Sequence, residues 1–351
     1  MASQQAIKNV ARCTLVALLL HVMDESLYKD AELCDGVVYH YFVSPPDGGM
    51  PTLLFCHGWP STSFDWRFQV TYFVERGYGV IAPDMLGYGG THAPTELREY
   101  TARKYCEQLV ALLDLEGAEK VVAIGHDWGS VAVSNLSNWY PDRFVAFAFL
   151  GTPYIPPDSS TVGMPLEIMN ARMQYLYGYE PLGFWMFLSS DEERPAEVLE
   201  AHLDSLYSLI FSADPTIWKT ELCPAGALKR WLVADHVAMP MFFMHEEIIE
   251  EHQRRFKKAG IAPSLNWFKS AACGLDKADF TQLPPENRFI KQPVFLAACT
   301  RDAANRAERV EESTSFMENP TLCTFDCGHW VQLEKADELN AALEEFVRAQ
   351  L

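Results

Sequence analysis

The sequence predicts an α/β protein with a doubly wound, mostly parallel sheet and an inserted helical cap. Short apolar runs alternate with segments of helical spacing on both sides of one long interruption. The apolar run that starts at Val121 passes directly into a glycine turn and then into a helix-like segment. With 351 residues and 49% hydrophobic content, the chain is large enough to bury a core and to carry an insertion.

The segments before residue 114 have the patterns expected of this fold. Strands are predicted at 35–43, 52–56 and 79–82, and helices at 68–76 and 100–113. The glycine-rich loop at 83–90 contains neither GxGxxG opening a helix nor glycines followed by Lys-Ser/Thr. The sequence therefore gives little support to nucleotide binding.

The stretch from Val121 to Ser130 predicts a nucleophile elbow, a sharp turn that projects one side chain from the end of a strand. Gly125 and Gly129 would allow strand and helix to approach closely, and Asp127 lies between them. An ionised carboxylate can attack an electrophilic sp³ carbon directly, and water must then break the resulting ester. Taken alone, Asp127 is also consistent with a helix N-cap.

The turn His57-Gly-Trp-Pro60 directly follows the predicted strand at 52–56. Its position favours a backbone N–H, that of Trp59, facing a pocket at the strand end. Together with the N–H of Trp128, which follows Asp127, it would form an oxyanion hole.

After a strand at 145–150 the alternation stops, and the chain becomes helical, aromatic and proline-punctuated. We predict an N-terminal helical extension at 1–34, a core domain at 35–152 and 285–351, and a cap domain at 153–284. The cap has enough aromatic surface to wall a buried pocket. The residues predicted to line this pocket are His57, Phe184, Trp185, Trp267, Phe268 and Trp330.

The strand pattern resumes at 293–299 and 321–325, and each strand is followed by a candidate catalytic residue. Asp302 follows the first of these strands, and His329 follows the second after a glycine. The chain order of Asp127, Asp302 and His329 is nucleophile, acid and histidine, which is typical of this architecture. The order of the three is much more specific than any one of them.

Composition limits the choice of partner and compartment. A formal charge of −19 argues against nucleic acid and anionic membranes as partners. Nine scattered cysteines without a CxxC pair favour a reducing compartment, and we expect a cytoplasmic location. The apolar run at 13–22 is too short to span a bilayer; it is interpreted as an amphipathic or packing helix, with a signal peptide as the weaker alternative.

No cofactor or metal is predicted. His245 and His252 are seven residues apart, which is the wrong spacing for HExxH, and the acids between them are typical of a solvated helix face. The expected partners are a hydrophobic small molecule and water. The oligomeric state stays open, with a dimer among the options.

Together these motifs resemble the α/β-hydrolase superfamily, and within it the epoxide hydrolases, closest to the soluble fungal-type enzymes. The resemblance covers roughly residues 35 to 348. It also rests on the segments 84–91, 218–220, 265–267 and 326–330. The resemblance implies that Asp127 forms an alkyl ester, that Asp302 orients His329, and that His329 activates the water that hydrolyses the ester.

The chain departs from the family pattern in the cap. Two tyrosines that bind the epoxide oxygen in the family are matched here by Phe184 and Phe268. One lost donor of this kind commonly costs roughly 3 kcal/mol, or about a hundredfold in rate. Four nearby tyrosines are candidates for a substitute donor, although helical spacing does not show which of them faces the pocket: Tyr154, Tyr175, Tyr177 and Tyr179.

Several functions stay open on these residues. A dehalogenase would need donors for a halide, and the indole N–H groups of Trp59, Trp128 or Trp185 are candidates. A repurposed enzyme of secondary metabolism would use Asp127 and His329 as acid and base in a cyclisation, elimination or retro-aldol step. A non-catalytic ligand receptor is disfavoured by the intact set of nucleophile, acid and histidine.

Overall fold

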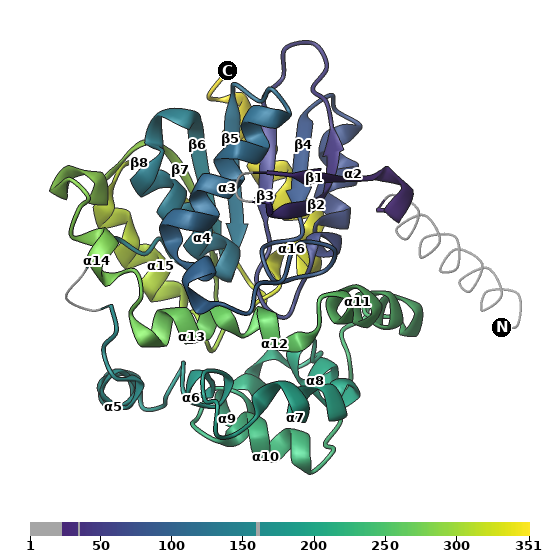
Figure 1. The fold of residues 1–351 in the computed structure, drawn as a ribbon, viewed down its shortest axis with the longest axis vertical. Coiled ribbons are helices and arrows are strands. Elements are labelled where there is room, and N and C mark those ends of the chain that lie inside the picture. Colours follow the sequence, from purple (N-terminus) through teal and green to yellow (C-terminus); the bar gives the residue numbers. More distant parts are fainter. Residues whose placement is uncertain (1–22, 34–35, 159–161) are drawn as a thin grey trace, which may run out of the picture.

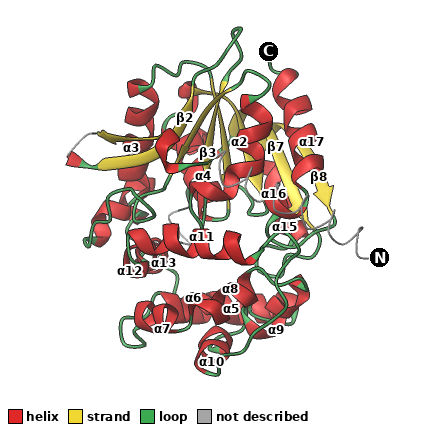
Figure 2. Ribbon diagram, turned by 90° about the vertical axis from the view of Figure 1, so that its right-hand side faces the viewer, coloured by secondary structure: helices red, strands yellow, loops and turns green. Residues whose placement is uncertain are grey.

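A computed structural model describes residues 23–33, 36–158 and 162–351, and it contains one twisted sheet (Figures 1 and 2). The strand order is β1-β2-β4-β3-β5-β6-β7-β8. β2 pairs antiparallel with β1 and β4, and the other neighbours pair in parallel. The strands are β1 (Tyr28–Glu32), β2 (Val38–Ser44), β3 (Thr52–Cys56), β4 (Gly79–Pro83), β5 (Val121–His126), β6 (Phe144–Leu150), β7 (Ile290–Cys299) and β8 (Met317–Phe325).

The central strands β3, β4 and β5 are buried along their whole length, which explains why their sequences are continuous apolar runs rather than alternating ones. Helices cover both faces of the sheet: α3 and α4 lie on one face, and α2 and α17 lie on the other (Figures 1 and 2). The helices of this layer are α2 (Arg67–Val74), α3 (Ala102–Leu115), α4 (Trp128–Trp139), α15 (Ala307–Ser313), α16 (Val331–Glu334) and α17 (Ala336–Arg348).

A second helical layer lies below the sheet in Figures 1 and 2, and it comes from the chain between β6 and β7. We refer to this segment, residues 151–289, as the cap segment. Its helices are α5 (Leu166–Tyr177), α6 (Phe184–Leu188), α7 (Pro195–Ala201), α8 (Leu203–Ile210), α9 (Trp218–Glu221), α10 (Ala227–Val233), α11 (Glu246–Lys258), α12 (Ile261–Ser264), α13 (Asn266–Cys273) and α14 (Lys277–Phe280).

Short 3₁₀ helices complete the described secondary structure. They are η1 (Glu25–Leu27), η3 (Ser63–Trp66), η4 (Leu97–Tyr100), η5 (Pro141–Arg143), η6 (Pro215–Ile217), η7 (Pro285–Arg288) and η8 (Thr314–Phe316).

The architecture confirms the predicted fold class, because a mostly parallel sheet is covered on both faces and interrupted by one helical segment. The exact domain boundaries, at 152/153 and 284/285, stay predictions.

The N-terminal prediction needs one correction. Residues 28–32 were expected in a helical extension, but they form β1 and pair with β2 from Tyr28↔Phe42 to Glu32↔Val38. An edge strand of five mostly exposed residues lacks the apolar alternation by which a strand is recognised. The apolar run at 13–22 lies outside the described residues.

Candidate active site

The predicted elbow is formed by the junction of β5 and α4. Asp127 has φ 54° and ψ −123°, a backbone conformation that non-glycine residues rarely adopt. A Cβ atom on Gly129 would lie 1.8 Å from the carbonyl oxygen of Cys56, and one on Gly125 would lie 2.3 Å from that of Gly129. Glycine is therefore required at both positions, since a side chain there would overlap backbone atoms.

Two backbone N–H groups hold the carboxylate of Asp127. The N–H of Trp59 donates to Oδ1 of Asp127 at 2.9 Å, and the N–H of Trp128 also hydrogen-bonds to this carboxylate. Gly58 is close by, where a Cβ atom would lie 2.4 Å from Oδ1 of Asp127. These are the two N–H groups that the sequence assigned to an oxyanion hole, and in the resting structure they lie against the carboxylate of the nucleophile candidate.

The structure brings Asp127, His329 and Asp302 together at the carboxyl ends of the strands. Nε2 of His329 lies 3.6 Å from Oδ2 of Asp127, and its Nδ1 lies 2.6 Å from Oδ2 of Asp302. The other oxygen of Asp302 accepts the backbone N–H groups of Ala304 and Asn305 at 2.8 and 2.9 Å. Asp302 is therefore fixed on both oxygens and fixes the imidazole in turn.

Burial and charge shift the pKa values of this group. Burial raises the pKa of the Asp127 carboxyl above its ordinary value, although His329 and the two N–H donors oppose the rise. Burial acts to lower the pKa of His329, but the charge and hydrogen bond of Asp302, together with Asp127, more than offset it and raise that pKa. An imidazole with a raised pKa is a stronger base once it is neutral.

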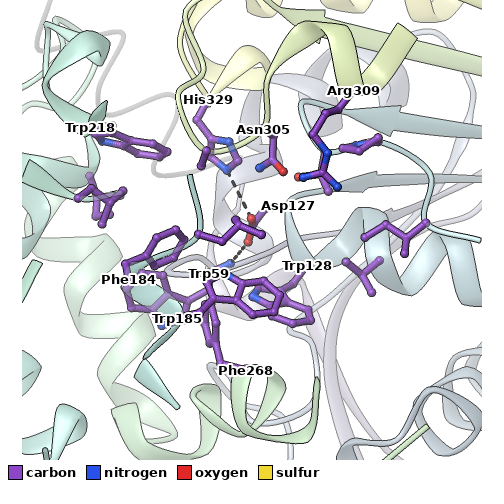
Figure 3. A pocket seen from close by; sticks show the side chains of 18 residues that line it. Trp59, Asp127, Trp128, Phe184, Trp185, Trp218, Phe268, Asn305, Arg309 and His329 are labelled. Carbon is purple, nitrogen blue, oxygen red and sulfur yellow. Dashed lines mark hydrogen bonds and ion pairs between the residues drawn. The ribbon is translucent and has the colours of Figure 1, made fainter. Parts of the chain in front are cut away.

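A cavity lies beside Asp127 (Figure 3), and its space amounts to about 710 Å³ when the part open to solvent is included. Its wall is mostly aromatic and aliphatic, and the few polar groups gather around the candidate nucleophile. The lining residues are Trp59, Asp127, Trp128, Val131, Thr152, Pro153, Ile155, Leu182, Phe184, Trp185, Ile210, Trp218, Leu222, Phe268, Ala304, Asn305, Arg309 and His329.

Of the six residues predicted to line the pocket, Phe184, Trp185 and Phe268 do so. The other three do not, and each is held elsewhere. His57 Nε2 accepts the backbone N–H of Met85. The indole N–H of Trp330 donates to the carbonyl of Ile210, and that of Trp267 donates to the carbonyl of Leu86. Trp267 instead lines a neighbouring cavity, which shares Trp128, Val131, Ile155 and Trp185 with the first.

None of the four candidate tyrosines lines the cavity above Asp127 in the part of the chain that the structure describes. The hydroxyl of Tyr154 donates to Asn138 and to the carbonyl of Arg288, and that of Tyr179 donates to the carbonyl of Ala303. Tyr175 is 88% exposed. Tyr177 packs under the guanidinium of Arg306. The expectation that one of them replaces the missing phenols finds no geometric support.

Sequence reasoning missed three polar residues of the cavity, Thr152, Asn305 and Arg309. The last two follow Asp302 by three and seven residues, in the loop and the helix that come after the end of β7. Because ligands bind beyond the carboxyl ends of parallel strands, polar residues soon after such an end were a usable signal.

Among the described residues no cluster of three or more His, Cys, Asp or Glu side chains is arranged to hold a metal ion. The histidine His252, one of the pair with the wrong spacing, is buried in α11. Its Nδ1 lies 2.8 Å from the hydroxyl of Tyr207, and its Nε2 lies 3.1 Å from Oδ1 of Asp65. Within the same described ranges, every helix is too short or too polar to cross a membrane.

Comparison with known proteins agrees with this geometry. A family model of the alpha/beta hydrolase fold matches residues 51–181. Bifunctional epoxide hydrolase 2 of Mus musculus is 29% identical over 308 residues, which cover 87% of this chain and 53% of that protein. Epoxide hydrolase A of Mycobacterium tuberculosis is 28% identical over 314 residues, which cover 87% of this chain and 92% of that protein.

A solved structure of an epoxide hydrolase is also similar to this chain. The crystal structure of epoxide hydrolase A from Mycobacterium thermoresistibile has a TM-score of 0.74 and 28% identity, covering 92% of this chain and 98% of that one. The chain spans about half the length of the mammalian relatives that it matches.

Fold and site together define an α/β-hydrolase fold with an aspartate on its nucleophile elbow. In sequence and structure the chain is similar to epoxide hydrolases.

Proposed function

We propose that the chain is an epoxide-hydrolase-like enzyme that acts on a hydrophobic small molecule through an ester on Asp127. The observation that carries the proposal is the arrangement of the two carboxylate oxygens. Oδ1 of Asp127 accepts the N–H of Trp59, whereas Oδ2 faces the imidazole of His329 at 3.6 Å, beyond direct hydrogen-bond distance. One oxygen is held and the other is available to react.

In the first step Oδ2 attacks a ring carbon of the epoxide, and the C–O electron pair moves to the ring oxygen. Oδ1 becomes the carbonyl oxygen of the new ester and already accepts the N–H of Trp59. The alkoxide that forms takes a proton from water, which completes ring opening.

In the second step a water molecule takes the space between Nε2 of His329 and the ester. The imidazole accepts a proton from the water as the water attacks the ester carbon, and the N–H groups of Trp59 and Trp128 bind the tetrahedral oxyanion. The imidazolium then gives this proton to the leaving oxygen as the ester C–O bond breaks, which releases the diol and restores the neutral imidazole. Asp302 orients the imidazole and stabilises its positive charge.

The finer affiliation, with the soluble fungal-type epoxide hydrolases and with both cap tyrosines replaced by phenylalanine, belongs to the same proposal. Phe184 and Phe268 both line the cavity, with ring centroids 6.3 Å apart, which supports their assignment to the tyrosine positions. The donor to the leaving oxygen must then be another group. Trp59 supports this role best: it lines the cavity, packs edge-on against Phe268 at 5.5 Å, and has a buried Nε1 without a partner among the described residues.

Single turnover in H₂¹⁸O tests the proposal. If an ester forms on Asp127, the ¹⁸O of the attacking water enters the Asp127 carboxylate, because water attacks the ester carbon. Peptide mass spectrometry should then find the ¹⁸O in Asp127, and the diol of the first turnover should contain none. Direct attack of water on the epoxide puts the label in the diol at once and would refute the ester. A cyclisation, elimination or retro-aldol reaction would label neither Asp127 nor a diol.

A second candidate function is hydrolysis of a carbon–halogen bond. The observation that favours it is that no hydrogen bond joins the indole N–H of Trp59, Trp128 or Trp185 to another described residue, although all three line the cavity. By contrast, the indole N–H of Trp218, which also lines the cavity, donates to the carbonyl of Leu209. Free indole donors suit a halide as well as an alkoxide. Halide release from 1-haloalkanes, measured beside diol formation from epoxides of equal chain length, separates the two.

We also propose a reducing compartment such as the cytoplasm. In support, the seven cysteines in the described ranges are all free thiols, and most of them are buried.

A further inference from the structure

Arg309 is a cation in the catalytic cavity without an acidic partner. It lies in α15 and is the only lysine or arginine among the described residues that line the cavity. No hydrogen bond or ion pair joins its guanidinium to another described side chain. Its neighbour Arg306, outside the cavity, shows the usual arrangement, with an ion pair to Glu308 at 2.9 Å.

Arg309 is partly buried and borders the cavity. Burial lowers the pKa of Arg309, and the nearby Tyr177 and Glu312 only partly oppose the change. A bound molecule that covers this guanidinium would remove its remaining water and would have to supply an acceptor in exchange. The chain as a whole carries a formal charge of −19, so a cation in the cavity is a local exception to a field that repels anions.

A second donor lies next to it. Asn305 is 9% exposed, lines the same cavity, and has a side-chain amide without a hydrogen bond to another described residue. In Figure 3 the polar ends of Asn305 and Arg309 lie on the same side of the cavity as His329, across from Phe184, Trp185 and Phe268. Asp302 fixes this side, since its Oδ1 accepts the backbone N–H of Asn305 at 2.9 Å.

We propose that Arg309 and Asn305 bind a carboxylate of the substrate, so that the enzyme acts on small electrophiles that carry a carboxylate within the same cavity as the reacting carbon. This specificity rests on the proposed function of Asp127. A planar carboxylate matches the fork of donors on a guanidinium. A phosphate dianion fits less well, because the described lining offers it no second cation.

Binding of unreactive probes tests the subsite independently of catalysis. 3-Phenylpropanoate and 3-phenylpropanamide have nearly the same shape and differ in charge, and calorimetry gives the affinity of each. Wild-type protein should bind the carboxylate at least about tenfold more tightly than the amide, as expected for charge-assisted hydrogen bonds. Arg309→Met should abolish this preference, Arg309→Lys should retain part of it, and Arg306→Met should leave it unchanged.

Kinetics with 3-phenylglycidate and its primary amide then test specificity. Arg309→Met should lower the carboxylate-to-amide ratio of kcat/KM by at least about tenfold, mainly through KM of the carboxylate. Asn305→Ala should lower it by a smaller factor, which keeps the proposal testable if Arg309→Met does not fold. An equal fall in kcat on both substrates would instead make Arg309 a donor to the leaving oxygen and overturn the carboxylate subsite.

The two proposals fail in different ways. Protein that prefers the carboxylate probe but opens no epoxide would refute the reaction and leave the subsite standing. Protein that opens neutral epoxides but shows no carboxylate preference, or keeps the preference in Arg309→Met, would refute the subsite alone. Absence of measurable carboxylate binding at millimolar concentration would also refute it.

Discussion

Replacing His329 by glutamine should separate the two proposed chemical steps. Attack by Asp127 does not require the imidazole as a base, because Oδ2 of Asp127 lies 3.6 Å from Nε2 and is not held by it. Hydrolysis of the ester does require a base, and a positioned general base contributes about 10²–10⁴ in rate, or about 2.7–5.4 kcal/mol of activation free energy. Ester formation should therefore continue while its hydrolysis slows by at least about a hundredfold.

The assay is intact-mass spectrometry after mixing His329→Gln with an excess of epoxide. The variant should gain the mass of one substrate at stoichiometric yield, and peptide mapping should locate the gain on Asp127. One secondary effect is expected: His329 helps to oppose the rise in the pKa of Asp127, so ester formation in the variant should shift to somewhat higher pH. His329→Gln with normal stability, no adduct across this pH range and no diol would refute the division of roles, since it would place the imidazole in the first step.

Four further predictions follow from the contacts and pKa directions described above. The double variant Phe184→Tyr/Phe268→Tyr should speed the opening of neutral epoxides by about 10- to 100-fold per restored donor, read as the single-turnover rate; an unchanged rate would show that these rings do not face the leaving oxygen. Steady-state kcat should rise with pH through a His329 pKa above 6.5, because the base must be neutral. Because the pKa of His329 is higher in the folded state, its protonation stabilises the fold fully below about pH 6.5, and this stabilisation is lost as pH rises through the folded-state pKa. Tm of the wild-type protein should therefore fall over the pH range in which kcat rises, and Tm of His329→Gln should not show this fall. Gly129→Ala should lower the free energy of unfolding by about 3 kcal/mol or more in denaturant titration, since its Cβ would lie 1.8 Å from a backbone oxygen, whereas Gly117→Ala, with open space but φ +63°, should cost only about 1–2 kcal/mol.

The elbow and the order of the candidate triad could be predicted because their causes are local. Gly125 and Gly129 are needed wherever a strand turns at once into a helix, and the carboxyl ends of parallel strands meet at one edge. These two rules place Asp127, Asp302 and His329 together without knowledge of the packing. The strand β1 was missed for the opposite reason: an exposed edge strand carries no buried face, so its sequence lacks an apolar pattern.

The lining of the cavity could not be predicted, because it depends on how the cap segment packs. Trp330 and Trp267 were expected in the pocket as large aromatics, yet each turns its indole N–H to a backbone carbonyl elsewhere. A buried indole needs a partner, and a sequence does not show which side of the ring finds one. His252 shows the same limit: an acid-rich helix pattern indicates a solvated face, but this residue lies on the buried side and bonds to Asp65.

The cavity divides its chemistry between two parts of the chain. Every ionisable group that lines it among the described residues comes from outside the cap segment, from the loops and helices that follow β5, β7 and β8: Asp127, Arg309 and His329. The cap segment contributes mostly aromatic and aliphatic surface, and the two phenols expected there are absent. Charge that develops on the leaving group in the proposed reaction can meet donors from both parts, of which the indole of Trp59 is the candidate at the nucleophile. On the proposed function, the cap segment selects the shape of a substrate, and the groups that follow the strands select its charge.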